Sequence, residues 1–193
     1  MNETIRQGAP LPRRENTKLA IWVFLSGECV FFGALITTYL LLRLRSPTDF
    51  AAAKAHLSIP LIAVNTFILI FSSYMVVRAL EAIRDGKQKV LRNNLLVVTL
   101  LGIIFVSGQA YEWSTLFKAG LSVASAMGTP FFTITGIHGT HVFIGIVWSV
   151  YLQLGIRKGA YTQKRHLGIE NFGLYWHFVD IVWIILFTLF YLI

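Results

Sequence analysis

Charged residues are the class that this sequence has least of. Asp, Glu, Lys and Arg make up 13% of the 193 residues, whereas soluble domains carry about 25%. Hydrophobic residues make up 55%, and the mean hydropathy is +0.65. This composition excludes a soluble enzyme and a disordered chain. The single cysteine, Cys29, cannot form an internal disulfide, which excludes a secreted disulfide scaffold.

Acidic residues are the scarcer of the two charged kinds, with 9 Asp and Glu against 17 Lys and Arg. The basic residues lie at the edges of apolar blocks, where they can contact anionic lipid head groups. No basic stretch is interleaved with aromatic residues, so nucleic acid is not an expected partner. The net charge of +8 therefore indicates contact with a membrane surface.

The charged clusters divide the sequence into five apolar blocks. Each is long enough to cross a bilayer, which takes roughly 20 residues, and a helix satisfies its own backbone groups in lipid. We therefore expect an all-α polytopic membrane protein, a single bundle of five transmembrane helices in residues 18–193 preceded by a tail at 1–17. The linker 43–58 is expected to contain a short interfacial helix. The predicted spans are 19–42, 59–80, 94–116, 131–154 and 172–193.

The distribution of basic residues predicts the orientation. Thirteen of the 17 Lys and Arg fall in the N-terminal tail, the second loop and the fourth loop with their flanks. The other side keeps only Arg43, Arg45, Lys54 and Lys118. Because basic residues favour the cytoplasmic side, the N-terminus is expected in the cytoplasm and the C-terminus outside.

Several ionisable residues lie inside these spans, where each costs roughly 2.5–3.5 kcal/mol to insert and is usually functional or paired. At about 1.5 Å of rise per residue, Glu28 and Asp180 lie about 13 Å below the cytoplasmic surface. They are expected to face helix interfaces. Glu112 and His138 lie about 6 and 12 Å from the outer face, which predicts that they pair. The residues are Glu28, Glu112, His138, His141 and Asp180, with His177 nearer an edge.

Structural roles compete with functional ones at these positions. His138 and His141, three residues apart on one helix face, could form hydrogen bonds to other helices. Glu112 could reach the lipid head groups. Asp180 could accept from Trp176 or Trp183, or from a histidine. Glu28 is the exception, because the residues around it in the sequence offer no obvious partner. A carboxyl in such surroundings is expected to be protonated and to have a specific role.

Small and aromatic residues predict how the helices pack and where they meet the interface. A stripe of small residues in the fourth span should allow close helix approach. Trp183 is expected to pack in the interior, whereas four other aromatics near block ends are expected to form an interfacial belt. The stripe is Gly136, Gly139, Thr140 and Gly145, and the belt is Trp113, Tyr175, Trp176 and Tyr191.

The histidine spacing disfavours a haem or metal site. Two haem ligands must lie on different helices at one depth, yet His138 and His141 share a helix. His141 and His177 differ in depth by roughly 10 Å. Cys29 has no histidine or cysteine beside it to complete a copper or zinc site. We expect no redox centre, cofactor or metal in this chain.

Five strings occur in the order in which they are found in one known family. They resemble subunit III of haem–copper respiratory oxidases, in its five-helix bacterial form. The match covers about residues 18–193, and the fourth and fifth strings are the most specific. The strings are FLSGECVFFG, VNTFILIFSS, GQAYEW, GIHGTHVFIG and YWHFVDIVW, at residues 24–33, 64–73, 108–113, 136–145 and 175–183.

The resemblance implies an accessory subunit of a proton-pumping terminal oxidase, which reduces oxygen to water in the bacterial cytoplasmic membrane. It implies packing against subunit I, with subunit II and a small subunit IV as further candidate partners. Haem and copper would belong to those subunits, and phospholipid would lie in the helix grooves of this chain. Cytochrome c oxidase is slightly favoured over quinol oxidase.

The family's buried helix carboxylate falls on Glu28, which implies support of proton uptake or a lipid groove. The family often has Ser directly before it, whereas Gly27 stands there, with Ser26 one position earlier. The remaining family positions form an intramembrane polar network. They fall on Glu112, His138, His141, Trp176, His177, Asp180 and Trp183.

Two other functions stay open from the sequence. One is the subunit III-like protein of a nitric oxide reductase, which shares the fold. The other is a small proton channel or transporter using Glu28 and Asp180. Transporters usually show internal repeats or broken helices at the membrane midplane, and the five spans here are unbroken.

Overall fold

A computed structural model describes residues 13–54 and 57–193, and the side chains of 13–15 and 52–53 are not described. Five helices in these ranges are long and apolar enough to cross a membrane, which confirms the five predicted spans. The expected short helix in the first linker is also present. The elements are α1 (Arg13–Arg45), α2 (Pro47–Lys54), α3 (Ile59–Arg84), α4 (Gln88–Lys118), α5 (Gly128–Arg157), α6 (Leu167–Phe187) and a π-helix, η1 (Thr188–Leu192).

The helices extend past the apolar blocks that predicted them. α1 already includes Arg13, ahead of the predicted start of the first span, and residues 1–12 of the predicted tail lie outside the described residues. Glycines end three of the helices. Gly86, Gly120 and Gly159 follow α3, α4 and α5 with φ of 77°, 87° and 71°. Each allows the next residue to bond back to the last turn, as Lys87 N does to Ala82 O at 2.8 Å.

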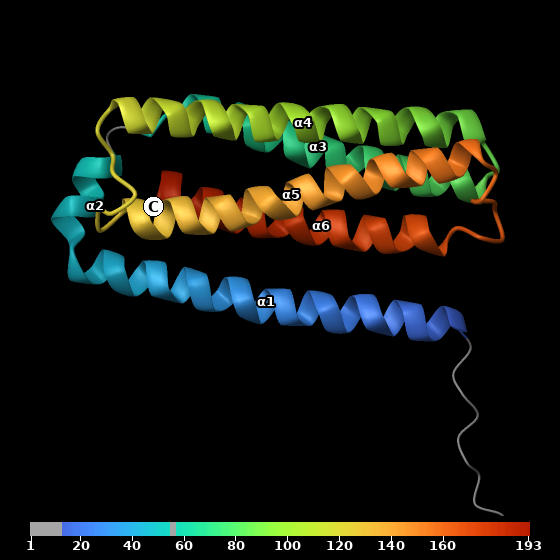
Figure 1. Cartoon of the computed structure of the whole chain (residues 1–193), viewed down its shortest axis with the longest axis horizontal. Helices are drawn as coiled ribbons and strands as arrows, with labels where there is room; N and C mark the ends of the chain where they lie inside the picture. The colour runs from blue at the N-terminus through green and yellow to red at the C-terminus, as the bar shows by residue number, and fades with distance from the viewer. Residues whose placement is uncertain (1–12, 55–56) are drawn as a thin grey trace, which may run out of the picture.

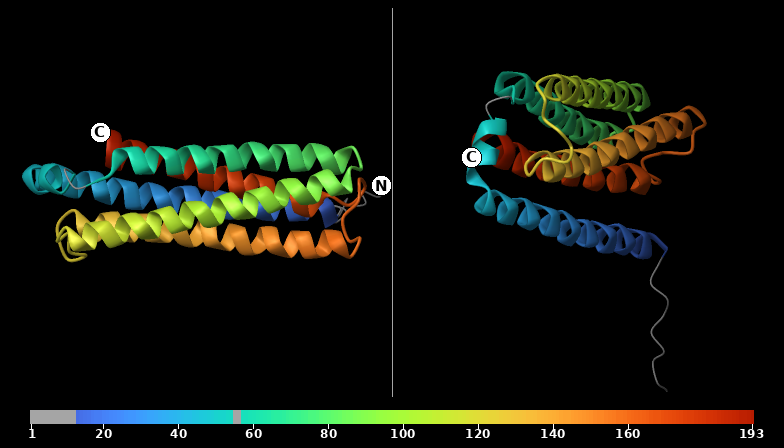
Figure 2. Two further views of the ribbon diagram at one scale, coloured as in Figure 1. Left: turned by 90° about the horizontal axis from the view of Figure 1, so that it is seen from above. Right: turned by 60° about the vertical axis from the view of Figure 1, so that its left-hand side comes forward.

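Helices α3 to α6 form a four-helix bundle, and α1 lies along one side of it (Figure 1). In the bundle α3 packs against α4 and α6, and α5 packs against the same two helices. α1 contacts α5 and α6, and Figure 2 shows it set apart from the other helices. In the most apolar 18-residue stretch of each span, 11% of the residues are buried in α1 and 56% are buried in the last span. α1 therefore depends on few contacts for its place.

The start of α1, the α3–α4 turn and the α5–α6 loop lie at one end of the molecule, which we call the basic end (Figure 1). The described members of the basic group predicted to share a side all belong to these segments and their flanks. α2, the α4–α5 loop and the C-terminus lie at the opposite end. The grouping of basic residues is thus confirmed, and the orientation in the membrane stays a prediction.

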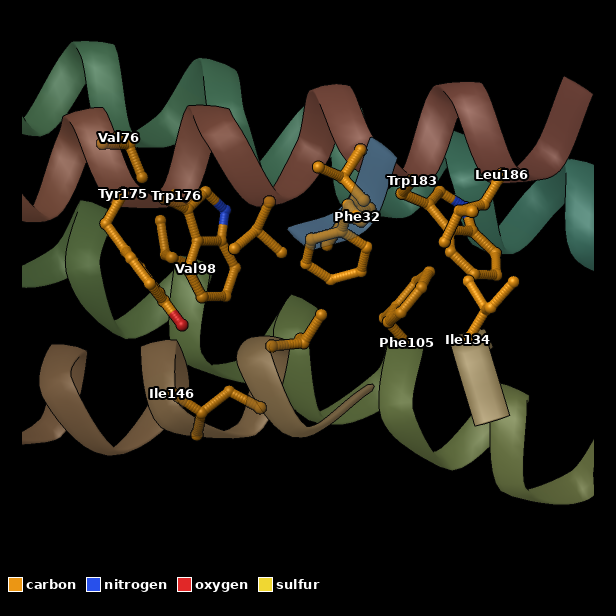
Figure 3. Close-up of a cluster of buried hydrophobic side chains, with 14 of the residues drawn as sticks. Phe32, Val76, Val98, Phe105, Ile134, Ile146, Tyr175, Trp176, Trp183 and Leu186 are labelled. Carbon is orange, nitrogen blue, oxygen red and sulfur yellow. The ribbon is translucent and has the colours of Figure 1, made fainter. Parts of the chain in front are cut away.

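Large aromatic side chains fill the interior of the bundle (Figure 3). Trp176 is fully buried because Gly145 leaves room for it: an added Cβ there would lie 2.6 Å from its ring. Gly136 likewise lies against Trp113, whereas Gly139 has open space within 4 Å. The predicted small-residue stripe is therefore closely packed at two of its three glycines.

The predicted interfacial belt is wrong for three of its four aromatics. Tyr175, Trp176 and Tyr191 are buried, with exposures of 2%, 0% and 1%. The indole of Trp176 donates to Ser72 Oγ at 2.9 Å, so its polar atom is satisfied inside the protein rather than by head groups. Trp183 is buried as expected and donates to Thr66 Oγ1 at 2.9 Å.

Candidate functional site

One buried stripe of α1 determines where Glu28 points. Leu25, Phe32 and Tyr39 recur every seven residues and are all buried. Glu28 is three residues from Leu25 and so lies on the same face of the helix. That face meets α5 and α6, and the Glu28 side chain is only 20% exposed. The carboxyl is therefore directed into the interface between α1 and the bundle.

Glu28 is paired with His141 of α5, a partner that its sequence neighbours did not reveal. Oε2 of Glu28 lies 3.2 Å from Nε2 of His141, and the histidine side chain is 14% exposed. Nδ1 of the same ring lies 2.9 Å from the carbonyl oxygen of Ile137. The expectation that Glu28 faces a helix interface is confirmed, and the contact joins helices α1 and α5.

The Ile137 contact determines the protonation chemistry of this pair. A carbonyl oxygen only accepts, so Nδ1 of His141 carries a hydrogen. Nε2 can then face Glu28 in two ways. Either His141 is neutral and its Nε2 lone pair faces the carboxyl, or His141 is cationic and an Nε2–H group faces the carboxylate. Oε2 of Glu28 lies 3.2 Å from Nε2 but has no hydrogen-bond partner among the described residues, so the contact is an ionisable pair and not a completed hydrogen bond.

Aromatic rings and a tyrosine hydroxyl hold the pair in place. Phe32 of α1 meets the His141 ring edge to face, with centroids 5.2 Å apart. Tyr175 of α6 donates to the carbonyl oxygen of His141 at 2.9 Å, and Phe24 stacks on Tyr175. Ser26 bonds the carbonyl oxygen of Trp22 instead of the carboxyl. The site thus brings together α1, α5 and α6.

Further polar contacts attach α1 to the rest of the chain near both of its ends. At the basic end, Lys18 lies 3.0 Å from Glu170 of α6, which also contacts Arg84 at 3.0 Å and His166 at 3.2 Å. At the other end, Arg43 donates to the carbonyl oxygen of Ile193 at 2.6 Å. Glu28 and His141 lie between these two attachments.

A second polar cluster surrounds Glu112, and it corrects the predicted partner. Glu112 is 1% exposed, and its Oε2 accepts from Tyr191 at 2.5 Å and from Gln109 at 3.1 Å. The predicted pairing with His138 and the alternative of a head-group contact are both wrong. Depth alone suggested His138, but Tyr191 lies on η1, which places its hydroxyl next to the carboxylate.

His138 has a different environment from His141, although the two share α5. It is fully buried, stacks on Trp183 with centroids 4.9 Å apart, and meets Phe105 edge to face. Neither ring nitrogen has a hydrogen-bond partner among the described residues. Within the described ranges, the expected interhelical hydrogen bond is therefore absent at the ring of His138, which faces α4 and α6, and the ring of His141 contacts α1 through the Glu28 pair rather than through a hydrogen bond.

Asp180 is not bonded to the indoles proposed for it, since Trp176 and Trp183 donate to Ser72 and Thr66. The histidine alternative also fails, because neither carboxylate oxygen has a hydrogen-bond partner in the described part of the chain. Ser73, close enough to Asp180 to interact with it, lies 2.5 Å from Nδ1 of His177. His177 of α6 therefore contacts Ser73 of α3 and joins the two helices.

Sequence reasoning missed the residues that complete these clusters. Tyr175 and Tyr191 were assigned to an interfacial belt, and Gln109 was not considered, although it lies one turn before Glu112. Glu170, within the first turn of α6, contacts Lys18, Arg84 and His166, and nothing in the sequence except its position pointed to these contacts. Within the described ranges, no group of three His, Cys, Asp or Glu side chains could hold a metal ion.

Comparison with known proteins decides the family. The family model described as cytochrome c oxidase subunit III matches residues 12–193. The chain belongs to this subunit III family. It is 34% identical to a probable quinol oxidase subunit 3 of Staphylococcus aureus strain USA300 over 182 residues, 93% of this chain and 90% of the relative. It is 38% identical to a cytochrome c oxidase subunit 3 of Thermostichus vulcanus over 181 residues, 91% and 86% of the two chains.

As a subunit III, the chain is a multi-pass membrane protein and one subunit of a respiratory haem–copper terminal oxidase. The resemblance inferred from the five strings is therefore confirmed. The relatives are named for both electron donors, so membership of the family does not select between cytochrome c and quinol. The residues carried over from the resemblance lie in the interface of α1 with the bundle and in the bundle interior.

Proposed function

We propose that this subunit III is a redox-inactive accessory subunit that stabilises subunit I and supports its uptake of protons in the bacterial cytoplasmic membrane. The observation that supports this role is the contact between Glu28 and His141. The contact places a carboxyl and an imidazole, two side-chain groups that act in proton transfer, next to each other within a membrane-spanning segment. The family membership supports the oxidase context.

The pair has a location suited to a proton-holding group. Lys18, which contacts Glu170 at the basic end, precedes Glu28 by ten residues, a helical rise of about 15 Å. The Glu28 side chain keeps 20% exposure, so it is not fully buried in the chain. A carboxyl and an imidazole can each accept and release a proton. This is the chemistry by which the pair would buffer protons for a neighbouring subunit.

The absence of redox chemistry is part of the proposal, with haem and copper held by the partner subunits. Two of the three membrane histidines have polar contacts that favour it, since His141 contacts Glu28 and Ile137 and His177 contacts Ser73. The third, His138, contacts the rings of Trp183 and Phe105 and belongs to no group of three His, Cys, Asp or Glu side chains that could hold a metal ion among the described residues. Subunit I is the proposed direct partner, with subunit II and a small subunit IV in the same complex. Phospholipid is the proposed bound molecule in this chain.

Purification through a tag on this chain tests the proposal. The purified complex should show haem absorption and consume oxygen with a cytochrome c or quinol donor. The same chain expressed alone should show no visible haem band. Haem bound in stoichiometric amount by the isolated polypeptide, or a tagged chain that purifies without any haem protein, would contradict the proposed role.

A further inference from the structure

A cavity of about 430 Å³ lies at the basic end of the molecule, where the α5–α6 loop meets the start of α6 and the first turns of α1 (Figure 1). Hydrogen bonds fix the loop that forms most of its wall. The backbone N–H of Arg165 donates to the carbonyl oxygen of Thr162 at 2.9 Å, and Thr162 N donates back to Arg165 O at 3.3 Å. Gln163 Nε2 donates to the carbonyl oxygen of Arg84 at 3.1 Å. The loop is therefore attached to the end of α3, so the cavity is formed before any ligand binds.

The ring of Tyr161 forms a fixed part of the cavity wall. It lies between the end of α5 and the start of α6, where two glycines make room for it. An added Cβ would lie 2.6 Å from the ring at Gly155 and 2.9 Å from it at Gly168. Gln88 of α4 also donates to the carbonyl oxygen of Tyr161 at 3.2 Å. The wall is therefore held by both neighbouring helices and by α4.

Cationic side chains outnumber acidic ones in this cavity. Lys18, Lys164 and Arg165 line it, and all three carry a positive charge at neutral pH. Glu170 is the one acid among the described residues that line it. Its carboxylate already contacts Lys18 at 3.0 Å and His166 at 3.2 Å. Three cations against one carboxylate leave the cavity with an excess of positive charge.

The lining residues favour a soluble anion over the head group of a lipid. Ala160 and Leu167 are the aliphatic residues among them, and they offer no apolar surface along which an acyl chain could extend. Lys and Arg bind phosphate groups through charge-assisted hydrogen bonds. The volume of about 430 Å³ is in the range of small-molecule sites, about 300–1,000 Å³, and exceeds what a single phosphate fills. The cavity therefore fits a soluble molecule that carries more than one phosphate group.

We propose that this cavity binds a soluble molecule with a diphosphate group, which by the predicted orientation comes from the cytoplasm. The diphosphate would lie among Lys18, Lys164 and Arg165. Lys18 belongs to α1 and the other two belong to the α5–α6 loop, so the bound molecule would tie the weakly packed α1 to the bundle. The site is separate from the Glu28 pair, which is ten residues further along α1, and the proton chemistry of that pair does not require this ligand.

Equilibrium dialysis with radiolabelled pyrophosphate tests the proposal on the tag-purified complex in phosphatidylcholine nanodiscs. The test variant is Lys164→Gln with Arg165→Gln. The matched control is Lys89→Gln with Arg92→Gln, which removes one lysine and one arginine near the start of α4, at the same end but outside the cavity. Glu170→Gln removes the acid of the cavity and should act in the opposite direction. The haem absorption of each purified variant reports whether the complex is assembled.

The unchanged protein and the matched control should each bind one pyrophosphate per chain, and more tightly than they bind inorganic phosphate. Each lost cation should weaken binding by about tenfold, so the test variant should bind about a hundredfold more weakly. Glu170→Gln should bind about fivefold more tightly, because one repulsive charge is removed, and misfolding cannot produce such a gain.

Four results would overturn the proposal. They are an unchanged protein that binds no pyrophosphate, equal affinities of the test and control variants, equal affinities for pyrophosphate and inorganic phosphate, and a Glu170→Gln protein that binds no better than the unchanged one. A lipid arm distinguishes the source of the phosphate. Complete loss of pyrophosphate binding when phosphatidylglycerol replaces phosphatidylcholine in the nanodiscs would also overturn the proposal, because the cavity would then hold a lipid head group.

Discussion

Oε2 of Glu28 on α1 and Nε2 of His141 on α5 lie 3.2 Å apart, and the carbonyl oxygen of Ile137 assigns the ring hydrogen to the other nitrogen. The two ionisable groups therefore face each other across a helix interface, although Oε2 of Glu28 completes no hydrogen bond among the described residues. A lone buried carboxyl would have to stay protonated to avoid the cost of a charge in lipid. A carboxyl paired in this way can give up its proton without creating a net charge.

Chemical labelling of Glu28 follows from this arrangement. A hydrophobic carbodiimide partitions into lipid and reacts with the acid form of a carboxyl, which one form of the pair supplies. We expect Glu28, at 20% exposure, to react faster than surface carboxylates and faster than buried Asp180. Glu28→Gln should abolish the labelling measured by mass spectrometry, whereas Glu81→Gln, at an exposed acid, should not. Equal labelling of the Glu28→Gln protein would contradict the assignment.

The pair also predicts non-additive stability effects. Glu28→Gln and His141→Phe should each lower the free energy of unfolding of the complex by about 1–3 kcal/mol, because each leaves one partner without its contact. His141→Phe retains an aromatic ring against Phe32. The double variant should be no less stable than the worse single one. The measurement is thermal unfolding followed by fluorescence, and strictly additive losses would show that the two residues do not interact.

Close packing at Trp176 gives a prediction with an internal control. At Gly145 a new Cβ would lie 2.6 Å from the buried Trp176 ring, which must then shift. Gly145→Ala should therefore destabilise the bundle by about 1–3 kcal/mol. Gly139→Ala adds the same methyl group on the same helix, where nothing lies within 4 Å. Its midpoint of thermal unfolding should match the unchanged protein, and equal losses in the two variants would contradict this packing.

Membrane orientation rests on the basic residues and is tested by reporter fusions. Thirteen of 17 Lys and Arg are assigned to one side, so a reporter fused after Ile193 should be active only outside the cytoplasm. A fusion at the α3–α4 turn, near Gly86, serves as the opposite control. Cytoplasmic activity at Ile193 would reverse the predicted orientation.

The spans and the family could be predicted from the sequence because both depend on local patterns. Runs of apolar residues between charged clusters predicted all five spans, and the motif strings indicated the family. The partners within the membrane could not be predicted in the same way. Depth alone placed Glu112 beside His138, but a side-chain contact also depends on the rotation of each helix, and Tyr191 reaches that carboxylate instead.

The aromatic residues show the same limit. Tyr175 and Trp176 lie near the end of an apolar block, which favoured an interfacial position. α6, however, is the most buried of the five spans, and its neighbours satisfy the polar atoms of both rings. Burial of a span depends on which helices surround it. Hydropathy does not report this, because a lipid-facing surface and a protein-facing surface are both apolar.

The most direct test of the account is the decline of oxygen consumption by the tag-purified oxidase during continuous turnover. The intact complex, the Glu28→Gln complex and the complex without this chain should begin at similar rates, because the redox centres are assigned to other subunits. Activity should then fall faster in the Glu28→Gln complex, and fastest without the chain. A fully assembled Glu28→Gln complex that cannot transfer electrons at all would contradict the accessory role. Identical lifetimes in all three complexes would contradict the proposed support of proton uptake and of subunit I.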